Sequence, residues 1–269
     1  MADRAPLELH RDGNARGRTL FFVHGWPDDH RVWEPQIEAF VGRHHCVRVT
    51  LPGYGDEDDA PRGFDFPELV DRLVASIEAV CEERGEEQVV LVGHDWGAYL
   101  AYLVEQRCPQ RIERLVTLDV GGHMRPTRLR DAALIAAYQL PLVATWLARR
   151  ALPRVANRVS HTVASRVGAP LHHRARPVDA RASYPYFYLW RGLTVPAYRD
   201  RLLRRCEPRC PTLYLYGKRK PVMFHSPRWL AMLEQRPDCA VVALDSDHWL
   251  TLSRPAEVNA AIARFVETA

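Results

Sequence analysis

The stretch Val92-Gly93-His94-Asp95-Trp96-Gly97 decides the fold of this 269-residue chain. It directly follows an apolar run, Gln88–Val92, that is typical of a buried strand, and it directly precedes Ala98–Gln106, whose apolar positions recur with helical spacing. Glycine on both sides of Asp95 permits a turn so tight that a Cβ at either position would clash. The stretch therefore predicts a strand-to-helix turn that holds the Asp95 carboxylate clear of the backbone. The alternative is an ordinary turn with a helix-capping aspartate.

Short apolar runs alternate with helical stretches through most of the chain. The expected strands are rich in β-branched residues and end in glycine or a small polar turn: Thr19–Val23, Cys46–Thr50, Gln88–Val92, Leu115–Leu118, Thr212–Tyr216 and Cys239–Leu244. Continuous apolar runs favour a parallel sheet that is buried on both faces. The amphipathic stretches Pro67–Glu83 and Ala256–Val266 predict helices that cover it. The alternation predicts an α/β fold with its site at the carboxyl ends of the strands.

The alternation stops between Gly121 and Cys206, where arginine, proline and aromatic residues dominate. We predict a mostly helical insertion here, which divides the chain into a core formed by residues 1–121 and 207–269 and an inserted helical cap formed by residues 122–206. Within the insertion, the apolar segment Ala132–Ala148 contains Pro141 and is short for a bilayer span. We expect a buried helix or one that lies along a membrane surface, without stable membrane insertion.

The aspartate in the turn limits the reactions that this site could catalyse. Attack of a carboxylate on an ester leads only to an anhydride, whereas attack on an sp³ carbon with a strained or good leaving group gives a stable ester. Asp95 therefore favours displacement at a carbon–oxygen or carbon–halogen bond.

Two further motifs follow expected strands. His24-Gly25-Trp26-Pro27 comes after Thr19–Val23, and Asp245-Ser246-Asp247-His248-Trp249 comes after the last strand. Each by itself is also typical of a simple surface turn. The loop at residues 218–225 has no carboxylate, whereas Asp119 directly follows Leu115–Leu118. Because Asp245 and Asp247 are too close to His248 in sequence to reach its Nδ1 atom productively, we expect them to be solvated turn residues.

Together these motifs resemble the epoxide hydrolase and haloalkane dehalogenase branch of the α/β-hydrolase fold, over nearly the whole chain. The resemblance implies a covalent ester mechanism, a helical cap, and neither a cofactor nor a metal. It implies that Asp95 is the nucleophile, that His248 is the base and that Asp119 is the acid that orients it. It also places the backbone N–H groups of Trp26 and Trp96 at an oxyanion site, with His24 in the same loop.

The resemblance further implies two cap tyrosines that protonate an epoxide oxygen. Tyr138 matches the first. Where the family has a tyrosine followed by arginine, this chain has Trp190-Arg191, so one of the nearby tyrosines would substitute. We predict Tyr188 as the second catalytic tyrosine, with Tyr186 and Trp190 as substrate-binding residues. The alternative for this aromatic run is packing between cap and core.

The expected reaction is hydrolysis of a hydrophobic epoxide to a vicinal diol. The first alternative is dehalogenation by the same displacement: Trp96 supplies a ring N–H for a halide, although Trp26 replaces the asparagine typical after His-Gly. The arginines that bind a substrate carboxylate in fluoroacetate dehalogenases are replaced by Trp96 and Tyr99. The second alternative is a ligand-binding protein without turnover.

Composition limits the remaining classes of protein. The chain is 47% hydrophobic and 26% charged, with a net charge of +4, which fits a globular protein. Its arginines extend along the whole chain, which argues against a nucleic-acid binder. Six cysteines do not form a disulfide scaffold, and Cys206 and Cys210 lack a second pair for zinc. The first residues contain no apolar signal core, so we expect a cytoplasmic protein with a small hydrophobic substrate. The sequence carries no signal for an oligomeric state.

Overall fold

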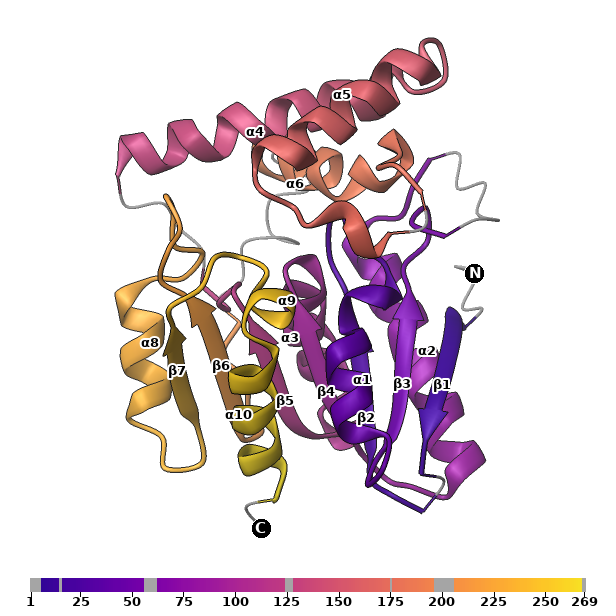
Figure 1. Cartoon of the computed structure of the whole chain (residues 1–269), viewed down its shortest axis with the longest axis vertical. Coiled ribbons are helices and arrows are strands. Elements are labelled where there is room, and N and C mark those ends of the chain that lie inside the picture. The colour runs from indigo at the N-terminus through magenta and orange to yellow at the C-terminus, as the bar shows by residue number, and fades with distance from the viewer. Residues whose placement is uncertain are drawn as a thin grey trace.

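A seven-stranded sheet forms the centre of the molecule (Figure 1). The computed structural model describes residues 6–14, 16–55, 62–123, 128–174, 176–195 and 206–267. In these residues the strand order is β1-β3-β2-β4-β5-β6-β7, and β1 is antiparallel to β3 while every other neighbouring pair is parallel. The strands are β1 (Glu8–Gly13), β2 (Thr19–Val23), β3 (His45–Thr50), β4 (Val89–His94), β5 (Ile112–Leu118), β6 (Thr212–Gly217) and β7 (Ala240–Leu244). The predicted mostly parallel sheet is confirmed.

Strand β1 was not predicted from the sequence. Its residues alternate between half-buried and exposed positions at the edge of the sheet, so it lacks the continuous apolar run of an interior strand. The predicted interior strands are found within one or two residues of their expected ends, except that β5 begins earlier, at Ile112.

Helices cover both faces of the sheet. On one face, α1 (Glu34–Phe40) and α10 (Pro255–Glu267) pack on one apolar cluster; on the other, α2 (Phe66–Arg84), α3 (Trp96–Arg107) and α8 (Pro227–Glu234) pack on a second. Shorter helices are η1 (His30–Trp33), η2 (Pro109–Arg111) and α9 (Leu250–Ser253). Because the interior strands are covered on both sides, most of their side chains are buried, which explains their apolar composition.

The segment between β5 and β6 is helical wherever the structure describes it. It contains α4 (Leu129–Ala148), α5 (Pro153–Arg166), η3 (Leu171–His173), η4 (Ala180–Ser183) and α6 (Tyr184–Thr194). Figure 1 shows these helices beyond the end of the sheet to which the parallel strands point. We call α4, α5 and α6, with the described residues between them, the cap. The helical insertion is confirmed, and it lies over the edge where the parallel strands end.

Candidate active site

The turn after β4 has the geometry that its glycines predict. Asp95 has a φ of 55° and a ψ of −123°, in a region that L-residues rarely adopt, and it begins α3. A Cβ at Gly93 would lie 2.4 Å from the Gly97 carbonyl oxygen, and one at Gly97 would lie 2.0 Å from the Val23 carbonyl oxygen. Only glycine fits at either position, so the sequence enforces the turn that projects Asp95 from the sheet.

The loop after β2 contacts the Asp95 carboxylate directly. The backbone N–H of Trp26 donates to Asp95 Oδ1 at 2.8 Å. A Cβ at Gly25 would lie 2.3 Å from Asp95 Oδ1 and 2.6 Å from the Trp96 nitrogen, so the loop approaches the turn as closely as backbone allows. One carboxylate oxygen is therefore held in an electropositive corner while the other remains available to a substrate.

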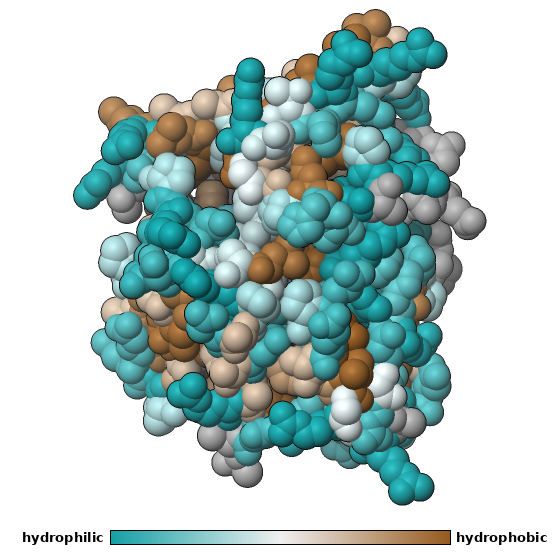
Figure 2. All heavy atoms as spheres, in the orientation of Figure 1, coloured by the Kyte–Doolittle hydropathy of each residue, from teal (hydrophilic) through white to brown (hydrophobic). Residues whose placement is uncertain are grey.

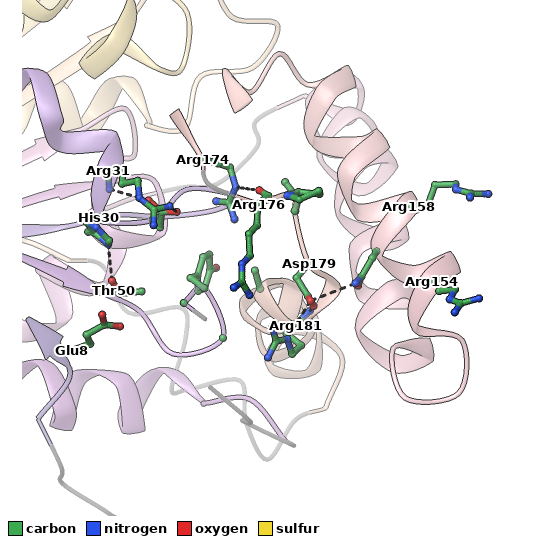
Figure 3. Close-up of a pocket in the computed structure, with 18 residues that line it drawn as sticks. Glu8, His30, Arg31, Thr50, Arg154, Arg158, Arg174, Arg176, Asp179 and Arg181 are labelled. Atoms are coloured by element: carbon green, nitrogen blue, oxygen red, sulfur yellow. Dashed lines mark hydrogen bonds and ion pairs between the residues drawn. The ribbon is translucent and has the colours of Figure 1, made fainter. Parts of the chain in front are cut away.

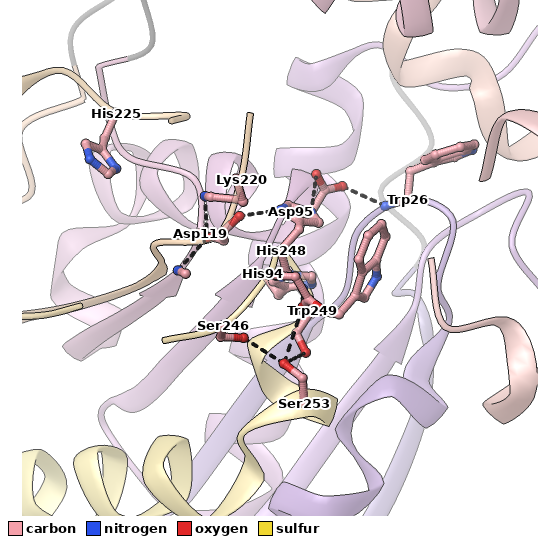
Figure 4. Close-up of polar contacts among 12 residues, drawn as sticks. Trp26, His94, Asp95, Asp119, Lys220, His225, Ser246, His248, Trp249 and Ser253 are labelled. Carbon is pink, nitrogen blue, oxygen red and sulfur yellow. Dashed lines mark hydrogen bonds and ion pairs between the residues drawn. The ribbon is translucent and has the colours of Figure 1, made fainter. Parts of the chain in front are cut away.

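His248 connects Asp95 to a buried acid (Figure 4). Its Nε2 lies 3.4 Å from Asp95 Oδ2, and its Nδ1 contacts Asp119 Oδ2. The other oxygen of Asp119 accepts from the Gly217 backbone N–H at 3.0 Å and from Lys220 Nζ at 2.5 Å. Asp119 is fully buried and has a φ of 67°, at the point where β5 ends. Strands β4, β5, β6 and β7 thus each deliver one part of this arrangement to one edge of the sheet.

Charge explains the protonation of His248. Burial alone would lower its pKa, but the carboxylates of Asp119 and Asp95 outweigh burial and raise the pKa of His248 to about 9. Burial opposes ionisation of Asp119, yet the charges of His248 and Lys220 hold the pKa of that carboxyl below its usual value. With Asp95 ionised, His248 is therefore an imidazolium at neutral pH.

A cavity of about 450 Å³ opens above Asp95. Asp95, Trp26 and His248 line it from the core, and Tyr138 of α4 and Tyr186 of α6 line it from the cap. Tyr186 is buried and Tyr138 is partly buried; burial raises the pKa of each phenol, and the charge of Asp95 raises it further. Neutral phenols face the carboxylate across an otherwise mostly apolar space, so the cavity suits a hydrophobic molecule with one polar atom.

A short hydrogen-bond chain fixes the hydroxyl of Tyr138. Trp190 Nε1 lies 3.0 Å from Gln139 Oε1, and Gln139 Nε2 lies 2.9 Å from the Tyr138 hydroxyl. An indole N–H can only donate, so the amide oxygen of Gln139 must face Trp190 and its NH₂ must face Tyr138. Since the Tyr138 oxygen accepts this bond, its own proton is available to donate to a substrate.

The comparison with family models decides the family. A model described as "Alpha/beta hydrolase family" matches residues 20–261. The chain is a member of the alpha/beta hydrolase family. Among curated proteins, this hydrolase is 24% identical to epoxide hydrolase 3 of Xenopus tropicalis over 95% of this chain and 73% of the relative. It is 26% identical to epoxide hydrolase 4 of Mus musculus over 94% of this chain and 74% of the relative.

Solved structures show the same fold. An epoxide hydrolase from Bacillus megaterium superposes with a TM-score of 0.71 at 22% identity, covering 97% of each chain. A haloalkane dehalogenase from Bradyrhizobium elkanii superposes with a TM-score of 0.67 at 20% identity, also covering 97% of each chain. The α/β-hydrolase fold predicted from the sequence is confirmed.

Tyr188 does not lie where the sequence predicted. Its hydroxyl donates to the Arg62 carbonyl at 2.8 Å and its ring lies under the Arg191 guanidinium, and it does not line the cavity above Asp95. Residues two positions apart on a helix point about 200° apart, so Tyr186 and Tyr188 cannot share a face of α6. Tyr186 faces Asp95 and therefore replaces Tyr188 among the candidate catalytic residues.

His24 and Trp190 also act at a distance from the cavity. His24 is buried; its Nε2 accepts from the Leu51 N–H at 3.0 Å, so its Nδ1 carries the proton toward the Gly25 carbonyl. His24 therefore braces the loop that carries Trp26 instead of contacting substrate. Trp190 does not replace a tyrosine over Asp95 but orients Gln139.

The acidic residues next to His248 lie at the surface. Asp247 Oδ1 accepts from the Trp249 N–H at 2.9 Å, and Asp245 Oδ1 lies 3.6 Å from Arg219. The His248 Nδ1 atom contacts Asp119 and neither of these two carboxylates. The positions agree with their expected role as turn residues.

Three residues of this hydrolase site have no signature in the sequence. Lys220 lies in the loop that lacks a carboxylate, Gln139 stands in an apolar run, and His94 Nε2 donates to the His248 carbonyl at 2.9 Å. The last contact holds the loop that positions the base. Lys220 and His94 act through contacts with residues far away in the sequence, and Gln139 is held by Trp190, 51 positions later. Only Gln139 could have been noticed in the sequence, because it is a polar residue in an apolar run.

Proposed function

We propose that this alpha/beta hydrolase converts a hydrophobic epoxide to a vicinal diol through an ester on Asp95. The observation that carries the proposal is the pairing of an aspartate in the nucleophile position with two phenols, Tyr138 and Tyr186, that line the same cavity. An alkoxide leaving group requires a proton, and Tyr138 and Tyr186 can each supply one. Departure of a halide requires no proton, so this arrangement favours the epoxide over the haloalkane.

In the first step, Asp95 attacks a ring carbon. The C–O bond of the epoxide breaks, and the oxygen takes a proton from Tyr138 or Tyr186. Asp95 Oδ1, already bonded to the Trp26 N–H, remains as the carbonyl oxygen of the ester. The reaction therefore begins without rearrangement of the carboxylate.

The second step needs a neutral histidine. Esterification removes the charge of Asp95, which is one of the two carboxylates that raise the pKa of His248. The pKa of His248 falls, and its imidazolium gives up the proton that restores the tyrosine consumed in ring opening. The neutral imidazole then takes a proton from the attacking water while Asp119 stabilises the imidazolium that results.

Water adds to the carboxyl carbon, and the Trp26 N–H stabilises the oxyanion. As the oxyanion collapses, His248 gives its proton to the departing alkoxide and the diol leaves; the proton left on Asp95 then passes to His248, which restores the starting carboxylate and imidazolium.

Isotope incorporation tests the proposal. Over repeated turnovers of a styrene-type epoxide in H₂¹⁸O, heavy oxygen should accumulate in the Asp95 carboxylate, because water attacks the ester at this carbon. Mass spectrometry of the peptide that contains Asp95 measures it. Asp95→Asn should lose several decades of rate. Turnover without label, or an active Asp95→Ala variant, would overturn the mechanism.

His248→Gln separates the two steps. Ester formation should continue while ester hydrolysis stalls, so intact-protein mass spectrometry should show the substrate mass bound to the protein. The same assay with haloalkanes in place of epoxides distinguishes the alternative reaction, since only the reactive class leaves an adduct. A protein that forms no adduct with either class would be a binding protein.

A further inference from the structure

Helix α4 exposes apolar residues along most of its length. After its first turn, which contains the exposed Arg130, the solvent-exposed positions recur at helical spacing and contain only alanine and leucine: Ala133, Leu134, Ala137, Leu140, Ala144 and Leu147. Two of its four buried residues are polar: Gln139 contacts Tyr138, and Thr145 Oγ1 accepts from Ser160 of α5 at 2.9 Å, while Leu142 and Trp146 are the other two. A surface helix of a soluble protein normally shows the opposite pattern. Among the described helices, only α4 is long and apolar enough to cross a membrane. Only 22% of its most apolar window is buried inside the protein, so most of that window is not covered by neighbouring elements.

The apolar surface continues beyond α4. Leu147 is 63% exposed, Leu152 in the connection to α5 is 56% exposed and Val155 on α5 is 56% exposed. Figure 2 shows brown atoms gathered along the upper edge of the molecule, where Figure 1 places α4 and α5. Exposed apolar side chains gathered on two neighbouring helices in this way mark an interaction site. We call it the apolar cap face, defined by Leu134, Leu140, Leu147, Leu152, Val155 and Val159.

Arginines border this face. The exposed residues Arg128 and Arg130 lie at the start of α4, and Arg150 follows its end. On α5, the exposed residues Arg154 and Arg158 precede Val155 and Val159, and Figure 3 shows both arginines at the rim of a second cavity that they help to line. Long cationic side chains beside apolar ones are typical of helices that lie in a membrane interface.

Charge is divided unequally between cap and core. Residues 122–206 contain 16 arginines and three aspartates, with neither lysine nor glutamate, which is a net charge of +13. The rest of the chain contains 21 basic and 30 acidic residues, a net charge of −9. The small overall charge therefore conceals a strongly cationic cap on an anionic core.

We propose that the apolar cap face docks on an anionic lipid surface. The +13 segment is attracted to lipid headgroups while the −9 core is repelled, which orients the molecule with its cap toward the lipid. The same charge argues against a second copy as the occupant, since the described cap residues, with 11 arginines and two aspartates, would give two facing caps a net charge of +9 each. Binding would be peripheral, because α4 packs on α5 and α6 through a face that includes the hydrogen-bonded Thr145.

The docked face adjoins the mouth of the cavity above Asp95. Leu134 of α4 and Val167, at the end of α5, are 37% and 39% exposed, and both line that cavity. A hydrophobic molecule dissolved in the lipid would thus reach the cavity without crossing bulk water. This consequence rests on the proposed function, but lipid binding itself does not.

Vesicle co-sedimentation tests the proposal without any turnover. The wild-type protein should sediment with vesicles of phosphatidylcholine mixed with phosphatidylglycerol, and should bind at least about tenfold more weakly to phosphatidylcholine alone or at high salt. An Asp95→Asn variant should bind as the wild type does, so failure of catalysis and failure of docking are distinguishable.

Two double variants assign the binding to the face. L140Q/L147Q removes exposed apolar groups outside the cavity lining, and R154Q/R158Q removes two of the bordering charges; each should weaken vesicle binding about tenfold or more. The control R16Q/R228Q removes two exposed arginines from the core and should leave binding unchanged. Circular dichroism and epoxide turnover in solution check that each variant is folded.

Three results would overturn the proposal: no binding of the wild type to anionic vesicles, equal binding by L140Q/L147Q, or a dimer in sedimentation that dissociates in L140Q/L147Q while no vesicle binding is found. The last result would assign the face to a second copy of the chain.

Discussion

Asp119 accepts hydrogen bonds from three donors on different elements: His248, Lys220 and the Gly217 backbone. The Lys220 side chain is only 4% exposed, and burial lowers its pKa while Asp119 opposes that effect. Because Lys220 also donates to Asp119, its positive charge reduces the stabilisation that Asp119 gives to the imidazolium of His248. Lys220 is therefore a positioning residue that sets the basicity of His248 through Asp119.

Replacing Lys220 should move the pH dependence of ester hydrolysis. In Lys220→Met the full charge of Asp119 acts on His248, so its pKa in the ester intermediate rises and the acidic limb of kcat shifts upward by about half to one pH unit. The pH–rate profile of single-turnover ester hydrolysis measures the shift. The matched control is Lys218→Met, an exposed lysine in the same loop. If Lys220→Met lowers the stability of the protein but leaves the acidic limb of the pH–rate profile unchanged, Lys220 has only a structural role.

The three tyrosines give a sharp test of which hydroxyls meet the substrate. Tyr138→Phe and Tyr186→Phe each remove a proton donor from the cavity and should slow ester formation by about 10²-fold. Tyr188→Phe removes only the bond to the Arg62 carbonyl and should change that rate less than about twofold. Stopped-flow measurement of ester formation decides between them. Equal losses in Tyr188→Phe and Tyr186→Phe would contradict the placement of the two residues on opposite sides of α6.

At the scale of elements, the approach of α3 to β2 depends on a missing side chain. Gly97 in the first turn of α3 lies so close to β2 that a Cβ would fall 2.0 Å from the Val23 carbonyl oxygen, a backbone atom that cannot move alone. The two elements must separate to admit it. That separation would also change the position of Asp95 relative to the Trp26 N–H.

Gly97→Ala should therefore lower the free energy of unfolding by about 1–3 kcal/mol, the usual cost of overpacking, and reduce turnover. Urea denaturation measures the first effect. Gly42→Ala is the control, because nothing lies within 4 Å of the added Cβ and Gly42 has no positive φ. Similar stabilities of the two variants would show that α3 and β2 adjust to the extra atom at little cost.

For the whole molecule, two histidines should give opposite pH dependences of stability. The pKa of His248 rises to about 9 on folding, so its contribution is complete below about 6.5 and is lost as pH rises through about 9. His225 behaves in reverse: burial lowers its pKa to about 4, so its contribution is complete above about 6.5 and is lost as pH falls toward 4.

Denaturation of three proteins at a series of pH values tests this. The difference in free energy of unfolding between wild type and His248→Gln should shrink between pH 6.5 and 9. The difference for His225→Gln should instead shrink between pH 6.5 and 4. A His248 difference that stays constant up to pH 9 would mean that the imidazolium is not stabilised by Asp119 and Asp95.

The sequence by itself determined the sheet, the turn at Asp95 and the helical insertion. These depend on local properties: apolar runs that must be buried, glycines without which a turn cannot close, and a segment without strand-forming runs. Asp119 could be named from sequence because a strand end is a local feature and the next loop offered no carboxylate. Strand β1 was not predicted, because the residues of this edge strand are half-buried or exposed and so do not form a continuous apolar run.

Only the tertiary structure decided what meets across the cavity and what remains outside. Lys220 reaches an acid 101 positions earlier, and Trp190 reaches Gln139 across 51 positions, so neither contact leaves a local pattern. The choice between Tyr186 and Tyr188 depended on the rotation of α6, which packing sets. The exposure of α4 also depended on the tertiary structure. An apolar run in the sequence indicates a helix that should be covered, but only the fold determines whether neighbouring elements cover it.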